Sequence, residues 1–87
     1  MKIKQDYNLL ERHGQYIVVS KNTGNLPDNA IILKGTAVFL WKLLKERDVT
    51  KAEMLEAVLN EFDISTVLAL GDIDVFVRTM KENGIIE

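Results

Sequence analysis

The chain has 87 residues, of which 47% are hydrophobic and 28% are charged, with no cysteine and a formal net charge of −2. This length and composition are typical of one folded domain spanning residues 1–87, and the lack of cysteine excludes disulfides, thiolate zinc sites and cysteine nucleophiles. The negative net charge has the wrong sign for a domain that binds nucleic acid through diffuse electrostatics.

A β-hairpin is predicted near the N-terminal end. Tyr7–Arg12 and Gln15–Ser20 flank His13-Gly14, and glycine can adopt the positive φ that a two-residue hairpin turn requires. Such a loop fixes the register and leaves apolar residues on both faces of the hairpin. The predicted partners are Leu10 with Ile17 on one face and Leu9 with Val18, beside Tyr16, on the other.

A third strand is predicted at Ala30–Leu33, a short apolar run rich in β-branched side chains. The preceding residues 21–29 concentrate glycine, proline and asparagine, which favours a loop. The chain then turns at Lys34-Gly35 into a helix that should end near Arg47 and that carries an apolar stripe at helical spacing. That stripe comprises Ala37, Phe39, Leu40, Trp41, Leu43 and Leu44.

A second helix is predicted to begin at Thr50. The run Thr50-Lys51-Ala52-Glu53 matches a capping box, in which the threonine and glutamate side chains each satisfy a backbone amide of the first turn. A break at residues 63–65 should end this helix. Its predicted core positions are Met54, Leu55, Val58, Leu59 and Phe62.

A third helix should run from about Thr66 to Asn83. Gly84 then serves as the left-handed residue after the helix, and Ile85-Ile86 packs back onto the last turn. With Ile73 at the centre of the buried face, the helical spacing predicts a core stripe. The predicted core positions are Leu70, Ile73, Phe76, Val77 and Met80.

A second stripe on the third helix starts on the flank of the core face and runs round the back. Its members are Leu68, Asp72, Val75 and Thr79. Two interpretations remain open for this stripe. It forms a binding surface, or it consists of the scattered exposed side chains that any surface helix carries.

The order of three N-terminal strands followed by three helices predicts an α+β fold. No stretch approaches the roughly 18 apolar residues that a membrane span needs, and the N-terminal residues lack an apolar signal region. We therefore expect a cytoplasmic protein with no membrane segment.

Catalytic and metal-binding patterns are absent from the sequence. The single histidine, His13, falls in a predicted turn, and Asp72 and Asp74 are two residues apart on a helix, so they project in different directions. No phosphate-binding glycine loop or nucleophile elbow is present. We therefore expect neither an enzyme nor a cofactor.

One passage of the chain identifies a family. Residues 29–44 read NAIILKGTAVFLWKLL, with ERHGQYIVV at residues 11–19 before them and IDVFVRTMKENGII at residues 73–86 after them. Together these segments resemble the PqqD-like family, which is also called coenzyme PQQ synthesis protein D-like or RiPP precursor peptide recognition elements. The resemblance covers nearly the whole chain and implies a winged helix-turn-helix-like domain.

The resemblance implies a non-catalytic protein that binds the leader of a ribosomal precursor peptide. In this family the leader adds as a strand to the third strand and lies in a groove beside the third helix, and the partner is a modifying enzyme, often a radical S-adenosylmethionine protein. Backbone hydrogen bonds give such a site its affinity, and apolar pockets give it selectivity. The positions that the resemblance places in the peptide site are Ala30, Ile31, Ile32, Leu33, Lys34, Leu68, Asp72, Val75, Phe76 and Thr79.

One position departs from the family pattern. Where the family commonly has leucine, asparagine, any residue and threonine, this chain has Leu33-Lys34-Gly35-Thr36, so lysine replaces the usual helix cap. The helix start should lose about 1 kcal/mol of capping unless Thr36 substitutes. The lysine also offers a positive charge to an acidic leader.

Three alternatives stay open at this stage. Residues 31–33 could be ordinary core with their edge covered by the preceding loop. A winged helix-turn-helix could bind DNA through its third helix, although Asp72, Asp74 and Glu82 make that helix a poor partner for phosphates. The apolar edge could also pair with a second copy of the chain to give a homodimer.

Overall fold

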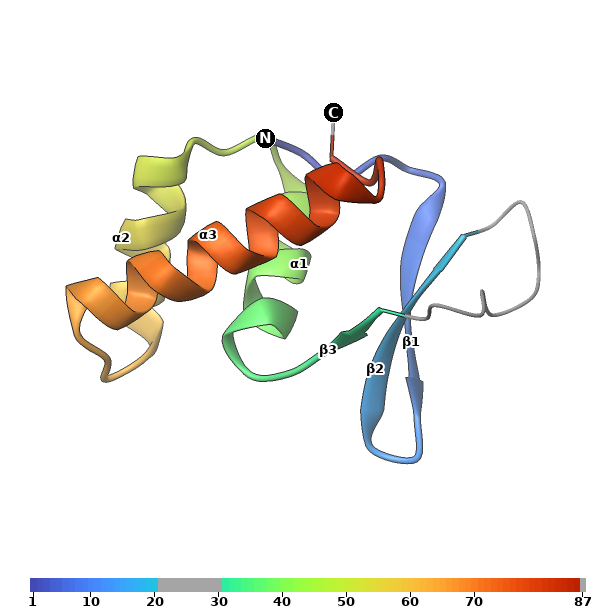
Figure 1. Ribbon diagram of the computed structural model, residues 1–87, viewed down its shortest axis with the longest axis horizontal. Coiled ribbons are helices and arrows are strands. Elements are labelled where there is room, and N and C mark those ends of the chain that lie inside the picture. Colours follow the sequence, from blue (N-terminus) through green and yellow to red (C-terminus); the bar gives the residue numbers. More distant parts are fainter. Residues whose placement is uncertain (21–30, 87) are drawn as a thin grey trace.

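The computed structural model describes residues 1–20 and 31–86. Three strands form one antiparallel sheet in the order β1-β2-β3, and three helices group together beside it (Figure 1). The α+β architecture predicted from the sequence is therefore confirmed. The elements are β1 (Tyr7–Arg12), β2 (Gln15–Ser20), β3 (Ile32–Leu33), α1 (Thr36–Glu46), α2 (Lys51–Glu61) and α3 (Thr66–Glu82).

The β1-β2 hairpin has the predicted turn and register. His13 and Gly14 both have positive φ, 54° and 78°, as a type I′ turn requires. Leu10 then lies opposite Ile17, and the neighbouring pair Leu9 and Val18 lies on the opposite face of the sheet. His13 itself is exposed at the tip of the hairpin.

Strand β3 is shorter than predicted. The Ile31 carbonyl accepts a hydrogen bond from the Val18 amide at 2.9 Å, but the assigned strand comprises only Ile32–Leu33. The predicted strand residue Ala30 and the predicted loop at 21–29 lie outside the described residues. Strand β3 is at the end of the strand order, so one of its edges has no partner strand in the described sheet.

Helix α1 begins without a side-chain cap. The cap residue is Gly35, with φ 53° and ψ −120°, and not Lys34 as the sequence comparison with the family suggested. Thr36 is the first helical residue and does not substitute as a cap, because no side-chain oxygen accepts a hydrogen bond there. Glycine suits this position since side chains strain a backbone with this positive φ.

The core lies between the helices and one face of the sheet. On α3 the buried positions are Ala69, Ile73, Phe76 and Met80, which follow one another at spacings of three or four residues. Two predicted core positions are wrong, because Leu59 and Leu70 are 37% and 36% exposed. The buried face of α3 includes the small Ala69 in place of Leu70, an orientation set by the packing of α1 and α2 against α3. Buried core residues elsewhere are Ile3, Val18, Leu33, Leu40, Trp41, Leu44, Val49, Met54, Val58, Ile85 and Ile86.

The C-terminal end of α3 terminates as predicted. Gly84 has φ 68°, and the Ile85 amide donates to the Met80 carbonyl at 2.9 Å, which closes the last turn. Ile85 and Ile86 are both buried. Ile86 also forms a β-bridge with Ile3, which ties the two ends of the described chain together.

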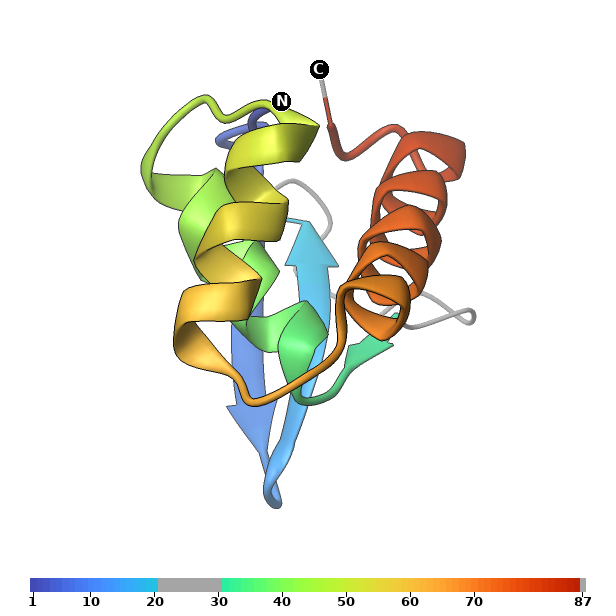
Figure 2. The same ribbon diagram turned by 90° about the vertical axis from the view of Figure 1, so that its left-hand side faces the viewer.

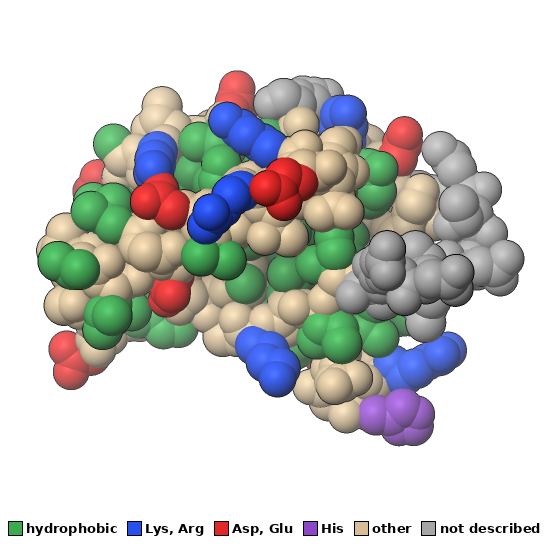
Figure 3. Space-filling view, viewed as in Figure 1, with side chains coloured by type: hydrophobic (Ala, Val, Ile, Leu, Met, Phe, Trp, Pro, Cys, Tyr) green, Lys and Arg blue, Asp and Glu red, His purple; other side chains and the backbone are tan. Residues whose placement is uncertain are grey.

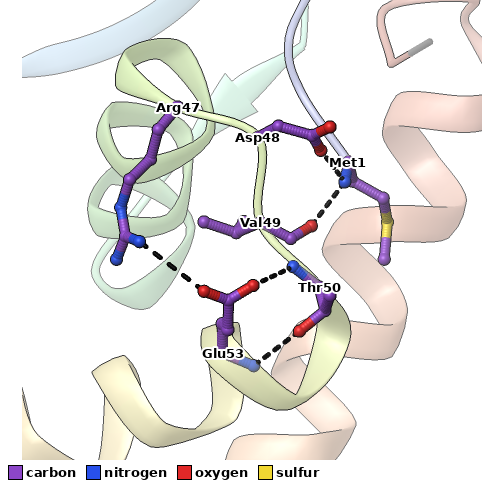
Figure 4. A network of polar contacts seen from close by, with 6 residues as sticks. All are labelled: Met1, Arg47, Asp48, Val49, Thr50 and Glu53. Carbon is purple, nitrogen blue, oxygen red and sulfur yellow. Dashed lines mark hydrogen bonds and ion pairs between the residues drawn. The ribbon is translucent and has the colours of Figure 1, made fainter.

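The capping box at the start of α2 is present (Figure 4). The Glu53 amide donates to the Thr50 hydroxyl at 3.1 Å, and the Thr50 amide donates to a Glu53 carboxylate oxygen at 3.0 Å. The Arg47 guanidinium lies 3.6 Å from the other carboxylate oxygen. Beside the box, the Met1 amino group contacts Asp48 and the Val49 carbonyl. This network joins the end of α1 to the start of α2.

Glu53→Gln is expected to lower the free energy of unfolding at neutral pH and to have less effect in acid. The Thr50 amide and hydroxyl hold the pKa of the Glu53 carboxyl below its ordinary value in the folded chain. A lowered folded pKa means that the charge stabilises the fold above the unfolded pKa, and that this contribution is lost as pH falls through the folded pKa. Urea unfolding of both proteins from neutral to acid pH measures the difference. Glu56→Gln removes the same charge from an exposed position outside the box and is the control.

Candidate functional site

A groove of about 300 Å³ lies between β3 and α3. Figure 2 shows β3 next to α3, and in Figure 3 hydrophobic side chains gather over this part of the surface. Eight of the ten predicted site residues line the groove. They are Ile31, Ile32, Leu33, Lys34, Asp72, Val75, Phe76 and Thr79.

The other two predicted site residues do not line the groove. Leu68 is 62% exposed one turn before Asp72 and lies beyond the groove lining, while Ala30 lies outside the described residues. The prediction also missed Thr36, Ala37 and Met80, which complete the lining. Met80 follows Phe76 by four residues, and this helical spacing predicts a core position for it and not a place in the site.

The backbone of Ile32 faces the groove. In the ladder between β2 and β3 the Val18 amide bonds the Ile31 carbonyl, so Val18 and Ile31 form a hydrogen-bonded pair. Such pairs alternate with non-hydrogen-bonded ones in antiparallel strands, which makes Ile17 and Ile32 a non-hydrogen-bonded pair. The amide and carbonyl of Ile32 therefore point away from β2, toward the edge of β3 that has no partner strand among the described residues; this edge is called the free edge below.

The wall on the α3 side is apolar where it meets the core and more open toward solvent. The floor of the groove, where the lining meets the core, is formed by Phe76 and Met80, which are 3% and 0% exposed. Val75 is 56% exposed and Thr79 is half-buried at the rim. This combination of an apolar floor with an open backbone edge can accept an extended peptide and leaves room for its side chains.

Two charged residues of opposite sign lie on the groove lining. Lys34 directly follows β3, and Asp72 lies on α3. Both are exposed, and within the described residues neither forms an ion pair. Both charges are therefore open to a ligand.

The opposite edge of the sheet, along β1, differs from the β3 edge. The Lys45 ammonium group contacts the Tyr7 carbonyl and lies 3.4 Å from the carbonyl oxygens of Lys4 and Gln5. Glu11 and Arg12 add charge to the end of β1, and charged side chains along an edge discourage strand addition. A hollow of about 570 Å³ lies beside β1, lined by Asn8, Leu9, Trp41, Lys42, Lys45 and Glu46. The β3 edge is thus the better candidate for pairing with a peptide.

Clustered metal-ligating side chains and buried polar side chains are both absent from the described residues. Among them, no three histidine, cysteine or acidic side chains lie close enough to hold a metal ion, and no polar or charged residue is buried. No helix within residues 1–20 and 31–86 has both the length and the apolar character that crossing a membrane demands.

Together the sheet, the three helices and the edge groove define a small α+β domain of the winged helix-turn-helix type. Residues 15–86 match the family model described as coenzyme PQQ synthesis protein D (PqqD), and the chain belongs to this family. The chain is also similar to a solved structure described as TbiB1 in complex with the TbiA(beta) leader peptide. The TM-score is 0.73 at 20% sequence identity, covering 100% of this chain and 95% of that one. No curated protein matches the chain.

Proposed function

We propose that this protein is a non-catalytic recognition domain that captures the leader of a ribosomally made precursor peptide and presents it to a modifying enzyme. The leader adds as a strand to the β3 edge, and its side chains enter the groove against α3. Holding the precursor in this way raises its effective concentration at the enzyme. We place the binding of the precursor in the cytoplasm, where ribosomes make it. The family resemblance favours a radical S-adenosylmethionine protein as the modifying enzyme.

One observation carries the proposal. The amide and carbonyl of Ile32 point outward from the free edge of β3, beside a groove that is lined by the apolar residues Val75 and Phe76. Strand addition at such an edge provides affinity through the backbone and selectivity through the groove. The likeness to TbiB1, which was solved with a leader peptide, supports a peptide as the ligand.

The test peptide is the leader of the precursor encoded nearest this gene. When it binds to the nitrogen-15-labelled protein, we expect the backbone amide NMR signals of Ile31–Leu33 and Asp72–Thr79 to shift. These residues form the two walls of the groove, so a peptide between them changes their environment. The shifts should saturate as peptide is added. A peptide of the same composition in scrambled order is the control.

Saturable shifts confined to Tyr7–Arg12 would place the ligand on the wrong edge and contradict the proposal. Shifts at Ile31–Leu33 that change with protein concentration before any peptide is added would indicate pairing between two copies of the chain. Sedimentation over the same concentrations distinguishes that homodimer from a peptide complex.

A further inference from the structure

The outer face of the sheet carries an apolar row that ends at the free edge. Leu10 pairs with Ile17, and Ile17 pairs with Ile32, so these three side chains lie side by side on one face. The neighbouring residues Val18 and Leu33 point to the other face and belong to the helix-side core, from which Ile17 is absent. Leu10 and Ile32 are 38% and 45% exposed, so the row remains accessible at both of its ends.

A peptide strand added at β3 would extend this row. The residue of the peptide directly opposite Ile32, called the central residue below, would place its side chain beside Ile32 on the outer face. An aliphatic side chain there continues the row from Leu10 through Ile17 and covers the exposed surface of Ile32. Burial of that apolar surface favours an aliphatic central residue over a polar one.

Lys34 determines which side chain is favoured in the peptide two residues from the central residue. Lys34 directly follows the last residue of β3 and lies on the groove lining. In an antiparallel peptide, the residue two places before the central residue lies opposite Lys34. Lys34 is exposed and forms no ion pair within the described residues. Because opposite charges across neighbouring strands attract, an aspartate or glutamate suits this peptide position.

The intervening peptide residue meets a different environment. It lies opposite Leu33 and points toward α3, where Val75 and Phe76 form the wall of the groove. An apolar side chain fills this space, and the nearby carboxylate of Asp72 opposes an acidic one.

We propose that the segment captured at β3 has the order acidic, apolar, aliphatic from its N-terminal side and pairs antiparallel to β3. The inference rests on the proposed function and names the class of peptide that the same groove takes. Antiparallel pairing is the more stable arrangement per residue. A parallel strand would require the reverse order.

This inference is tested by selecting binders of the whole protein from a random library of 12-residue peptides and then measuring their affinities. Selected peptides should be enriched in an acidic residue two places before an aliphatic one. Changing that acidic residue to lysine should weaken binding to the natural protein about two- to tenfold, since an attraction becomes a repulsion. The Lys34→Glu variant should instead prefer the lysine peptide. Lys81→Glu makes the same charge change on an exposed α3 residue outside the groove lining and should behave like the natural protein.

Amide shifts of the labelled protein with the best peptide separate this inference from the proposed function. Two results overturn the inference and leave peptide capture intact. In the first, peptides bind at Ile31–Leu33 but are not enriched in the acidic residue. In the second, the Lys34→Glu variant prefers the acidic peptide as strongly as the natural protein does. Enrichment of the reverse order overturns the antiparallel arrangement. Peptides that bind only elsewhere, or a selection that yields no binder, count against both.

Discussion

Ile32→Pro is expected to weaken peptide binding by roughly 5- to 150-fold while the domain stays folded. Proline removes the amide that points to the free edge and leaves a peptide carbonyl without its donor, which costs about 1–3 kcal/mol. The same amide makes no hydrogen bond to β2, because Ile32 and Ile17 form a non-hydrogen-bonded pair. Proline is tolerated on an edge strand for this reason. Isothermal titration with the leader measures the affinity, and circular dichroism checks the fold.

Two further variants separate the backbone effect from other causes. Ile32→Ala keeps the amide and carbonyl and should lose less affinity than Ile32→Pro. Leu33→Pro removes an amide that faces β2, so it should destabilise the fold itself. A folded Ile32→Pro protein that binds the leader as tightly as the natural protein would exclude strand addition at β3.

Local chemistry explains which parts of the fold could be predicted from the sequence. The hairpin register follows from the two-residue turn at His13-Gly14, and the start of α2 follows from Thr50 and Glu53, because each feature is fixed by residues adjacent in the chain. The start of α1 was assigned to the wrong cap residue. The family pattern predicts the cap at Lys34, whereas the turn geometry places it at Gly35.

The errors on the helices have a tertiary cause. A helical wheel gives the angles between side chains but not which angle faces the neighbouring elements. The packing of α1 and α2 against α3 centres the buried face on Ala69 and Ile73, which leaves Leu70 partly exposed. Nothing in the spacing of apolar residues distinguishes this orientation from one rotated by a fraction of a turn.

The candidate site, too, could be predicted where it depends on local spacing but not where it depends on tertiary packing. The second stripe on α3 continues at helical spacing from Thr79 back to Leu68, but β3 has only two residues. Only the part of α3 that faces this short strand can border the groove, so Asp72 lines it and Leu68 does not. The length of the strand, and with it the end of the groove, could not be read from the pattern on the helix.

Ile73→Ala is expected to lower the free energy of unfolding by about 2–5 kcal/mol, the usual cost of truncating a fully buried aliphatic side chain. Ile73 has no exposed surface and lies in the middle of the α3 core stripe. For a domain of this size each kcal/mol corresponds to roughly 4–8 °C in melting temperature, so the melting temperature should fall by about 8 °C or more. Thermal and urea unfolding followed by circular dichroism measure both quantities.

Val75→Ala, two residues further along the same helix, should have the opposite effects on stability and on leader binding. Its side chain is 56% exposed, so truncation should change the free energy of unfolding by less than about 0.5 kcal/mol. Because Val75 lines the groove, the same truncation should weaken leader binding, whereas Ile73→Ala should bind the leader normally at temperatures where it is folded. Equal losses of stability in the two variants would show that the stripe of Val75 belongs to the core, and normal binding by Val75→Ala would remove α3 from the proposed peptide site.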